Sequence, residues 1–156
     1  MREGDIAPDI ELADQTGTVR TLSSIASGTR TVLFFYPAAM TTGCTKESCH
    51  FRDLGKEFED AGAVRIGISM DTVDKQARFA DLNGLDYPLL SDGDGAVAKA
   101  FGVKRPLNIL KVRRITFVLD EDRKVLGIIG SEFNTNAHAD RALEMLATTP
   151  RRATSP

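Results

Sequence analysis

The sequence has no excess of positive charge. Its 156 residues include 20 lysine and arginine residues against 22 aspartate and glutamate residues, so the formal net charge at pH 7 is −2. A protein that holds nucleic acid by its phosphates normally carries a basic surplus. We therefore expect no nucleic-acid partner.

Long apolar runs are absent as well. The most apolar window, Val32–Tyr36, is far too short to cross a bilayer of about 30 Å as a helix. No apolar run follows Met1–Asp5, although a secretory signal requires one. These two absences predict a cytoplasmic protein without a membrane partner.

Cysteine is scarce, and nothing divides the chain. Two cysteines are too few for a disulfide-stapled secreted domain. No repeat, low-complexity stretch or linker interrupts the sequence, so we expect one domain over residues 1–147. The polar, proline-flanked segment 148–156 is expected to be a disordered tail. In a cytosolic protein, two closely spaced cysteines are more often catalytic, redox-active or metal-binding than structural.

Apolar periodicity predicts an α/β protein. The order of its elements indicates a mixed central sheet flanked by helices on both faces. This order matches a thioredoxin-like fold with an additional N-terminal β-hairpin. The expected strands are 10–12, 19–22, 31–36, 64–70, 115–119 and 124–129, the last two paired as a hairpin, and the expected helices are 44–61, 73–83, 95–101 and 136–147.

Cys44 follows a buried strand and opens a helix. Unpaired backbone N–H groups at a helix start carry partial positive charge and favour a thiolate over a thiol. At 100° per residue, Phe51 and Phe58 fall near Cys44 on the face that packs on the sheet, together with Leu54. Cys49 lies about 140° away. We therefore expect Cys44 to face the sheet and Cys49 to face solvent.

The spacing of the two cysteines restricts their chemistry. Five residues of helix place the Cα atoms of Cys44 and Cys49 about 8.6 Å apart. A disulfide needs Cα atoms within about 7 Å of each other. The two cysteines therefore cannot bond unless the first turns of the helix unwind.

The cysteines and histidines have alternative roles that the sequence also allows. The cysteines could be inert core residues, or Cys44, Cys49 and His50 could bind zinc. Structural zinc usually takes four ligands, and His138 is the chain's other histidine, so no metal is expected. His50 and His138 are expected to face solvent. Three phenylalanines are predicted to be core residues, namely Phe101, Phe117 and Phe133.

At this point the sequence resembles a known family. Pro37-x-x-x-Thr41-x-x-Cys44 is similar to the active-site signature of the peroxiredoxins. Cys49, five residues later, is similar to the peroxiredoxin Q (bacterioferritin comigratory protein) branch. The resemblance covers roughly residues 3–147 and continues through Cys44–Asp53, Ile68–Asp71, Tyr87–Asp92 and Arg114–Phe117.

The resemblance implies a thiol-dependent peroxidase that reduces hydrogen peroxide and organic hydroperoxides without a metal or other cofactor. Cys44 would attack the peroxide and become a sulfenic acid. Cys49 would condense with it to an intramolecular disulfide, which thioredoxin or a similar dithiol would reduce. The branch also implies a monomer or a weak dimer.

Neighbouring residues gain roles by the same resemblance. Thr41 would present its hydroxyl to the peroxide, and Pro37 would shield the thiolate from water. Arg114 would place a guanidinium beside the sulfur, oriented by Glu47. Arg113 is equally available by sequence, and only one of the two can face Cys44, because side chains alternate along a strand. In this branch the segment before the arginine contains glycine, and the segment 107–112 departs from that pattern. The sequence therefore does not decide whether Arg113 or Arg114 faces Cys44.

A second function uses the same two cysteines. A redox-sensing binding protein could be switched by the Cys44–Cys49 disulfide, with catalysis incidental. A sensor reacts about once per chain, whereas an enzyme turns over many times, so turnover separates the two functions. A scaffold with inert cysteines is the third alternative.

Overall fold

A mixed β-sheet forms the centre of the computed structural model, which describes residues 1–106 and 112–151. Its seven strands in this part of the chain have the order β2-β1-β5-β4-β3-β6-β7. Strand β4 runs parallel to β3 and β5, and the other pairs are antiparallel. The strands are β1 (Glu11–Ala13), β2 (Val19–Thr21), β3 (Arg30–Phe35), β4 (Ala63–Ser69), β5 (Leu89–Ser91), β6 (Ile115–Leu119) and β7 (Val125–Gly130), and the helices are α1 (Leu22–Ala26), α2 (Thr42–Asp53), α3 (Gly55–Asp60), α4 (Val73–Asn83), α5 (Ala96–Ala100) and α6 (Asn136–Thr148).

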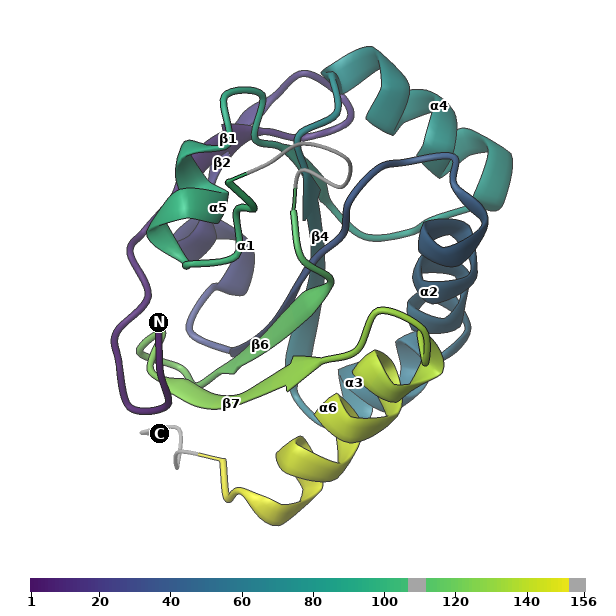
Figure 1. Cartoon of the computed structure of the whole chain (residues 1–156). Coiled ribbons are helices and arrows are strands. Elements are labelled where there is room, and N and C mark those ends of the chain that lie inside the picture. Colours follow the sequence, from purple (N-terminus) through teal and green to yellow (C-terminus); the bar gives the residue numbers. More distant parts are fainter. Residues whose placement is uncertain (107–111, 152–156) are drawn as a thin grey trace.

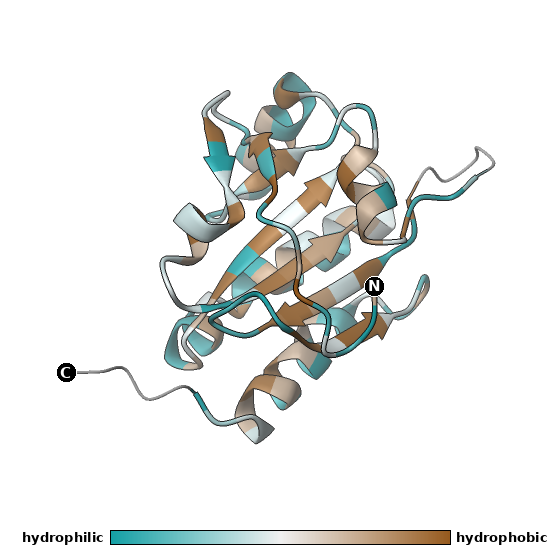
Figure 2. Ribbon diagram, turned by 90° about the vertical axis from the view of Figure 1, so that its left-hand side faces the viewer, coloured by the Kyte–Doolittle hydropathy of each residue, from teal (hydrophilic) through white to brown (hydrophobic). Residues whose placement is uncertain are grey.

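Helices cover both faces of this sheet (Figure 1). Every residue of β3 is buried, which is typical of a strand with helices on both sides. Because side chains alternate, Val32 and Phe34 pack with residues of α2, α3, α4 and α6, whereas Leu33 and Phe35 pack with residues of α1 and α5. The hydrophobic colouring accordingly follows the central strands (Figure 2).

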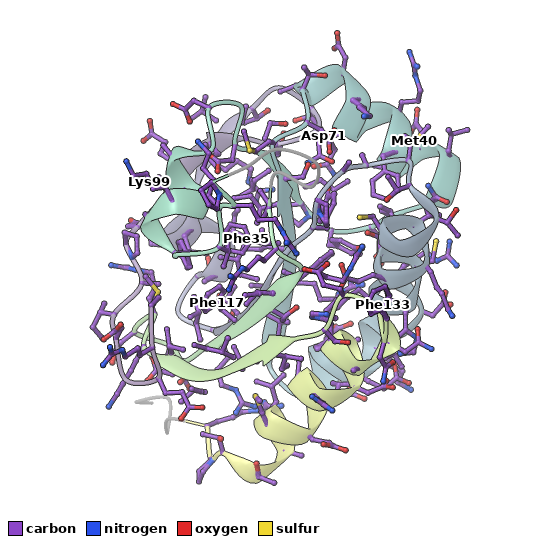
Figure 3. All side chains as sticks on the ribbon, in the orientation of Figure 1. Phe35, Met40, Asp71, Lys99, Phe117 and Phe133 are labelled. Carbon is purple, nitrogen blue, oxygen red and sulfur yellow. The ribbon has the colours of Figure 1, made fainter. Side chains whose placement is uncertain are left out.

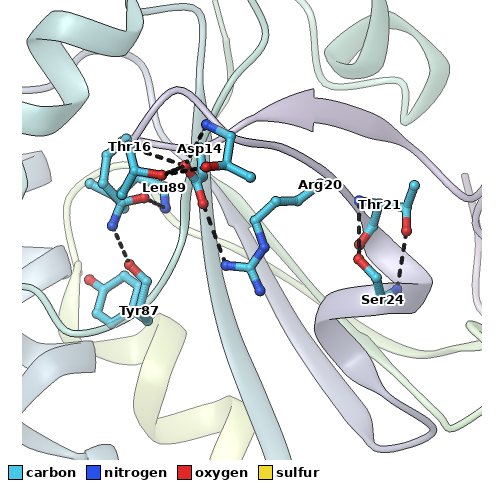
Figure 4. A network of polar contacts seen from close by, with 9 residues as sticks. Asp14, Thr16, Arg20, Thr21, Ser24, Tyr87 and Leu89 are labelled. Carbon is cyan, nitrogen blue, oxygen red and sulfur yellow. Dashed lines mark hydrogen bonds and ion pairs between the residues drawn. The ribbon is translucent and has the colours of Figure 1, made fainter.

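The N-terminal hairpin is tied to the sheet by side chains of its turn (Figure 4). The Asp14 carboxylate accepts hydrogen bonds from the backbone N–H and the hydroxyl of Thr16, at 2.8 and 2.6 Å. Gln15 donates to the carbonyl of Tyr87 and accepts from the N–H of Leu89, at 3.0 and 2.8 Å. The turn therefore fixes the segment that leads into β5.

The predicted fold class is confirmed, and most elements lie within one or two residues of their predicted bounds. Strand β6 and helix α4 have the predicted bounds, and β6 pairs with β7 as expected. Helix α1 and strand β5 were not predicted, because five and three residues are too short for a periodic signal. Among the described residues, no helix is long and apolar enough to cross a membrane.

The prediction of one helix over 44–61 is wrong. The helix breaks at Leu54, so α2 and α3 are separate. Arg65 donates to the carbonyl of Phe51 at 2.9 Å, and this carbonyl would otherwise accept from the N–H of Gly55. A Cβ on Gly55 would lie 3.1 Å from the Arg65 guanidinium. Glycine at this position therefore leaves room for the Arg65 guanidinium to bind the carbonyl of Phe51, and α2 ends there.

One of the three predicted core phenylalanines is misplaced. Phe101 and Phe117 are buried, but Phe133 is 98% exposed. Phe133 lies in the loop between β7 and α6 (Figure 3). The preceding residue, Glu132, turns inward to accept from the backbone N–H of Arg114 at 3.2 Å. The side chain of Phe133 then points away from the protein.

The end of the chain is described up to Arg151. Helix α6 has Thr148 as its last residue, and the carbonyl of Thr149 accepts from Arg30 at 2.8 Å. Residues 152–156 of the predicted tail lie outside the described residues, and so do residues 107–111 of the predicted lead to β6.

Candidate active site

The loop between β3 and α2 has a fixed, strained shape. Met40 has φ of 71° and is partly exposed, a conformation that costs a residue with a Cβ about 1 kcal/mol or more. The carboxylate of Asp71 accepts from the N–H of Ala39 at 2.6 Å, and the Thr41 hydroxyl donates to the carbonyl of Ala38 at 2.9 Å. Figure 3 places Met40 and Asp71 at this end of the protein.

The loop delivers Cys44 to the first turn of α2. Thr41 is the N-cap residue, and the first bond of the helix runs from the N–H of Thr45 to its carbonyl at 2.9 Å. The N–H of Cys44 therefore has no acceptor within the helix. The Cys44 side chain is fully buried, and Pro37 in the loop before it is buried.

Arg114 is the arginine that faces the sulfur. Its Nη2 donates to Cys44 Sγ at 3.3 Å, and its Nη1 donates to Glu47 Oε1 at 3.0 Å. Arg113, its neighbour in the segment before β6, is exposed. Arg114 shares a face with Thr116 and so points toward α2, as alternation along a strand requires.

Gly43 makes room for this guanidinium. A Cβ at Gly43 would lie 3.1 Å from Nη2 of Arg114. Gly43 is not among the site residues predicted from the sequence. A glycine in the first turn of a helix lowers helix propensity, and this cost is a sequence signal for a close approach of another group.

Glu47 completes the charged group from one turn farther along α2. It is fully buried, and its Oε2 has no hydrogen-bond partner among the described residues. Burial raises the pKa of Glu47 to about 8, although Arg114 acts in the opposite direction. Burial alone would lower the pKa of Arg114, but Glu47 and Cys44 beside it favour the charged guanidinium, and the pKa is raised.

The prediction that His138 faces solvent is wrong. Its side chain is fully buried, with Nδ1 at 2.8 Å from the Thr116 hydroxyl and Nε2 at 2.8 Å from the Ser131 carbonyl. Both ring nitrogens have hydrogen-bond partners, so the imidazole can be buried without leaving a polar atom unpaired. Burial lowers the pKa of His138. His50, by contrast, is partly exposed and lies 2.8 Å from Asp140 of α6.

Cys49 lies on the other side of α2, as the helix geometry predicts. It is partly exposed, and its sulfur is 3.7 Å from the side-chain oxygen of Asn83 at the end of α4. Helix α2 is continuous across both cysteines, which are not bonded to each other. Tyr87, in the segment that leads into β5, donates to the carbonyl of Ser48 at 2.7 Å, so the turn that carries Cys49 is also held from that segment.

The described residues contain no cluster of three or more histidine, cysteine, aspartate or glutamate side chains that could hold a metal ion. The group formed by Cys44, Arg114 and Glu47 is instead suited to nucleophilic chemistry. The sulfur is enclosed, which by itself disfavours a charged thiolate, but the helix start and the guanidinium contact stabilise negative charge on it.

Comparisons with known proteins agree with this chemistry. The model of the AhpC/TSA family matches residues 4–128. Peroxiredoxin Bcp of Escherichia coli (strain K12) is 38% identical over 151 residues, which cover 94% of this chain and 96% of that protein. The crystal structure of peroxidoxin BcpB from Mycobacterium tuberculosis has a TM-score of 0.92 at 58% identity, covering 96% of this chain and 99% of the other. A structure of Xanthomonas campestris peroxiredoxin Q has a TM-score of 0.83 at 34% identity, with coverage of 92% and 94%.

Proposed function

We propose a catalytic cycle for this chain from the premise that it belongs to the AhpC/TSA family and is a peroxiredoxin, a thiol peroxidase, of the branch that includes Bcp and peroxiredoxin Q. In this cycle Cys44 is the peroxidatic nucleophile and Cys49 is the resolving thiol. The observation that supports the assignment of Cys44 is the 3.3 Å contact between its sulfur and the Arg114 guanidinium. The Cys49 sulfur instead contacts the side-chain oxygen of Asn83 at 3.7 Å.

The first step is attack of the Cys44 thiolate on one oxygen of hydrogen peroxide or an organic hydroperoxide. The S–O bond forms as the O–O bond breaks, and the leaving oxygen takes a proton to become water or an alcohol. Cys44 is thereby oxidised to a sulfenic acid. Arg114 and the free N–H of Cys44 are the donors that stabilise the charge on the departing oxygen.

Two further residues assist this step. The Thr41 hydroxyl donates to Ala38 in the structure, and in the cycle it turns to the bound peroxide, which is a rotation about one side-chain bond. Pro37 is buried in the loop before Cys44 and keeps water away from the thiolate. Glu47 orients Arg114 through the 3.0 Å ion pair.

In the second step the thiol of Cys49 attacks the sulfenic sulfur. An S–S bond forms, and the sulfenic oxygen leaves as water. The two cysteines cannot meet while α2 is intact, so its first turns unwind before the bond forms. Thioredoxin or a similar dithiol then reduces the disulfide by exchange and becomes oxidised itself. No cysteine follows Cys49 in the sequence, so the chain offers no other resolving thiol.

The test is peroxide consumption by the full chain with thioredoxin, thioredoxin reductase and NADPH. Wild type should oxidise NADPH continuously, and Cys44→Ser should abolish the reaction. Cys49→Ser should consume about one equivalent of peroxide and then stop. Full turnover by Cys44→Ser would refute the assignment of the nucleophile.

The same assay separates the alternative functions. A single stoichiometric burst from wild type with thioredoxin and with a small dithiol would indicate a redox sensor. The absence of any reaction with peroxide would indicate a scaffold with inert cysteines.

A further inference from the structure

A buried histidine lies behind the arginine–glutamate pair. The ring of His138 is fully buried, and its Nε2 lies 2.8 Å from the carbonyl oxygen of Ser131. A carbonyl only accepts hydrogen bonds, so Nε2 carries a proton. Burial lowers the pKa of His138 and favours the neutral imidazole, in which the hydroxyl of Thr116 donates to Nδ1.

The same nitrogen also lies near the unpartnered oxygen of Glu47. His138 Nε2 lies 3.6 Å from Glu47 Oε2, and neither side chain is exposed. Arg114 occupies Oε1, and Oε2 has no hydrogen-bond partner in the described part of the chain. In an interior of low dielectric constant, an N–H dipole at this distance stabilises negative charge on the carboxylate.

We propose that His138 is a positioning residue of this peroxidase: it favours the ionised, oriented form of the Glu47 carboxylate, so that Arg114 stays against Cys44. The proposal rests on the proposed function, since it requires Cys44 to be the reacting thiol. Contacts connect the four side chains in order, from His138 to Glu47 at 3.6 Å, to Arg114 at 3.0 Å and to Cys44 at 3.3 Å.

Charged groups on several elements surround this pair. Burial disfavours a charged His138, as do Arg114 before β6 and Arg141 on α6, whereas Glu132 in the loop before α6 favours it. The result is a lowered pKa for His138, while burial and Glu132 raise that of Glu47 to about 8 against the effect of Arg114. Glu47 is therefore the group whose charge changes just above neutral pH, and His138 remains a neutral donor there.

The experiment measures the second-order rate constant for oxidation of Cys44 by hydrogen peroxide as a function of pH. His138→Leu removes the N–H group. It should slow oxidation about tenfold at neutral pH. In wild type the rate constant should rise with pH as Glu47 ionises, and in His138→Leu this rise should occur at higher pH, because Glu47 then ionises less readily. His138→Gln can place an amide N–H near the position of Nε2 and should retain most of the rate.

Two controls separate positioning from packing. Leu146 is buried on the same helix, so Leu146→Ala loosens α6 without removing the donor to Glu47, and it should leave the pH profile in place. In a Glu47→Gln background, His138→Leu should add less than about a twofold loss, because coupled residues do not act additively.

Three results would overturn the proposal. The first is a wild-type pH profile in His138→Leu. The second is a loss of rate and a shift of the pH profile in Leu146→Ala that equal those in His138→Leu. The third is the full tenfold loss of rate when His138→Leu is added to Glu47→Gln. Failure of the proposed function looks different, because Cys44→Ser would then still react with peroxide at the wild-type rate.

Discussion

The guanidinium of Arg114 lies 3.3 Å from the sulfur of Cys44, although 70 residues separate them in the sequence. It also holds Glu47 at 3.0 Å, so one planar group contacts both acidic side chains. This forked contact differs from that of a point charge, because a lysine cannot make both contacts in the same geometry.

Replacing Arg114 should therefore slow the attack on peroxide. We expect Arg114→Gln to lower the rate constant for Cys44 oxidation about 100-fold, the usual loss when a donor to a developing oxyanion is removed. Arg114→Lys should recover only part of it. The matched control is Arg113→Gln, since Arg113 is the exposed neighbour, and an equal loss there would contradict the assignment. Stopped-flow mixing with hydrogen peroxide measures both.

Tyr87 should restrain the second step of the cycle. Its hydroxyl donates to the carbonyl of Ser48 at 2.7 Å, beside Cys49, in the helix that must unwind. Tyr87→Phe keeps the ring and removes this bond, which contributes about 1 kcal/mol. Disulfide formation after a peroxide pulse should become about fivefold faster, as measured by acid quenching and thiol counting. Tyr36→Phe, whose hydroxyl bonds Gln76 of α4 instead, should leave that rate unchanged.

Ser48 should act in the opposite direction. Its hydroxyl is buried and has no hydrogen-bond partner among the described residues, and such a group costs about 1–3 kcal/mol in the folded helix. Ser48→Ala removes this cost and should stabilise folded α2. Disulfide formation should slow at least about fivefold, and more Cys44 should be overoxidised to sulfinic acid at high peroxide. Mass spectrometry after a peroxide titration would detect the additional oxygen, and an unchanged titration would contradict the prediction.

The buried carboxyl of Glu47 should make the stability of the fold depend on pH. Its pKa is raised from 4.5 to about 8, so between these values the unfolded chain releases a proton that the folded chain retains. Its contribution to stability is therefore favourable at low pH and is lost as pH rises through this range. Glu47→Gln cannot ionise, and its free energy of unfolding relative to wild type should increase between pH 4.5 and 8. Urea unfolding at several pH values measures this difference, and a constant difference would contradict the prediction.

Local sequence signals predicted the parts of the structure that depend on neighbours in the chain. The run that forms β3, the helix start near Cys44 and the place of Cys49 on the other side of α2 all follow from periodicity and helix geometry. Asp92–Gly95 forms a turn that is equally local, in which the N–H of Gly95 donates to the carbonyl of Asp92 at 3.0 Å. The Asp92 carboxylate accepts from the N–H groups of Val97 and Ala98 at 3.1 and 2.8 Å.

The remaining features depend on residues that are distant in sequence. His138 is buried because Thr116 and Ser131 supply both of its partners, and no pattern within α6 reveals them. The break at Leu54 requires Arg65 from β4. The choice between Arg113 and Arg114 follows from the register of β6 against β3, which the sequence alone leaves open.

The glycine at position 43 has a consequence for how this helix can vary. Its backbone is not in the left-handed region, so nothing in its conformation demands glycine, and alanine would strengthen the helix by about 1 kcal/mol. The added methyl group would press against Nη2 of Arg114 at 3.1 Å, on the side from which the guanidinium contacts Cys44. Gly43→Ala should therefore raise the thermal midpoint while it lowers peroxidase activity. The first turn of α2 gives up stability so that a cation can approach the thiol, and selection for stability alone would remove this glycine.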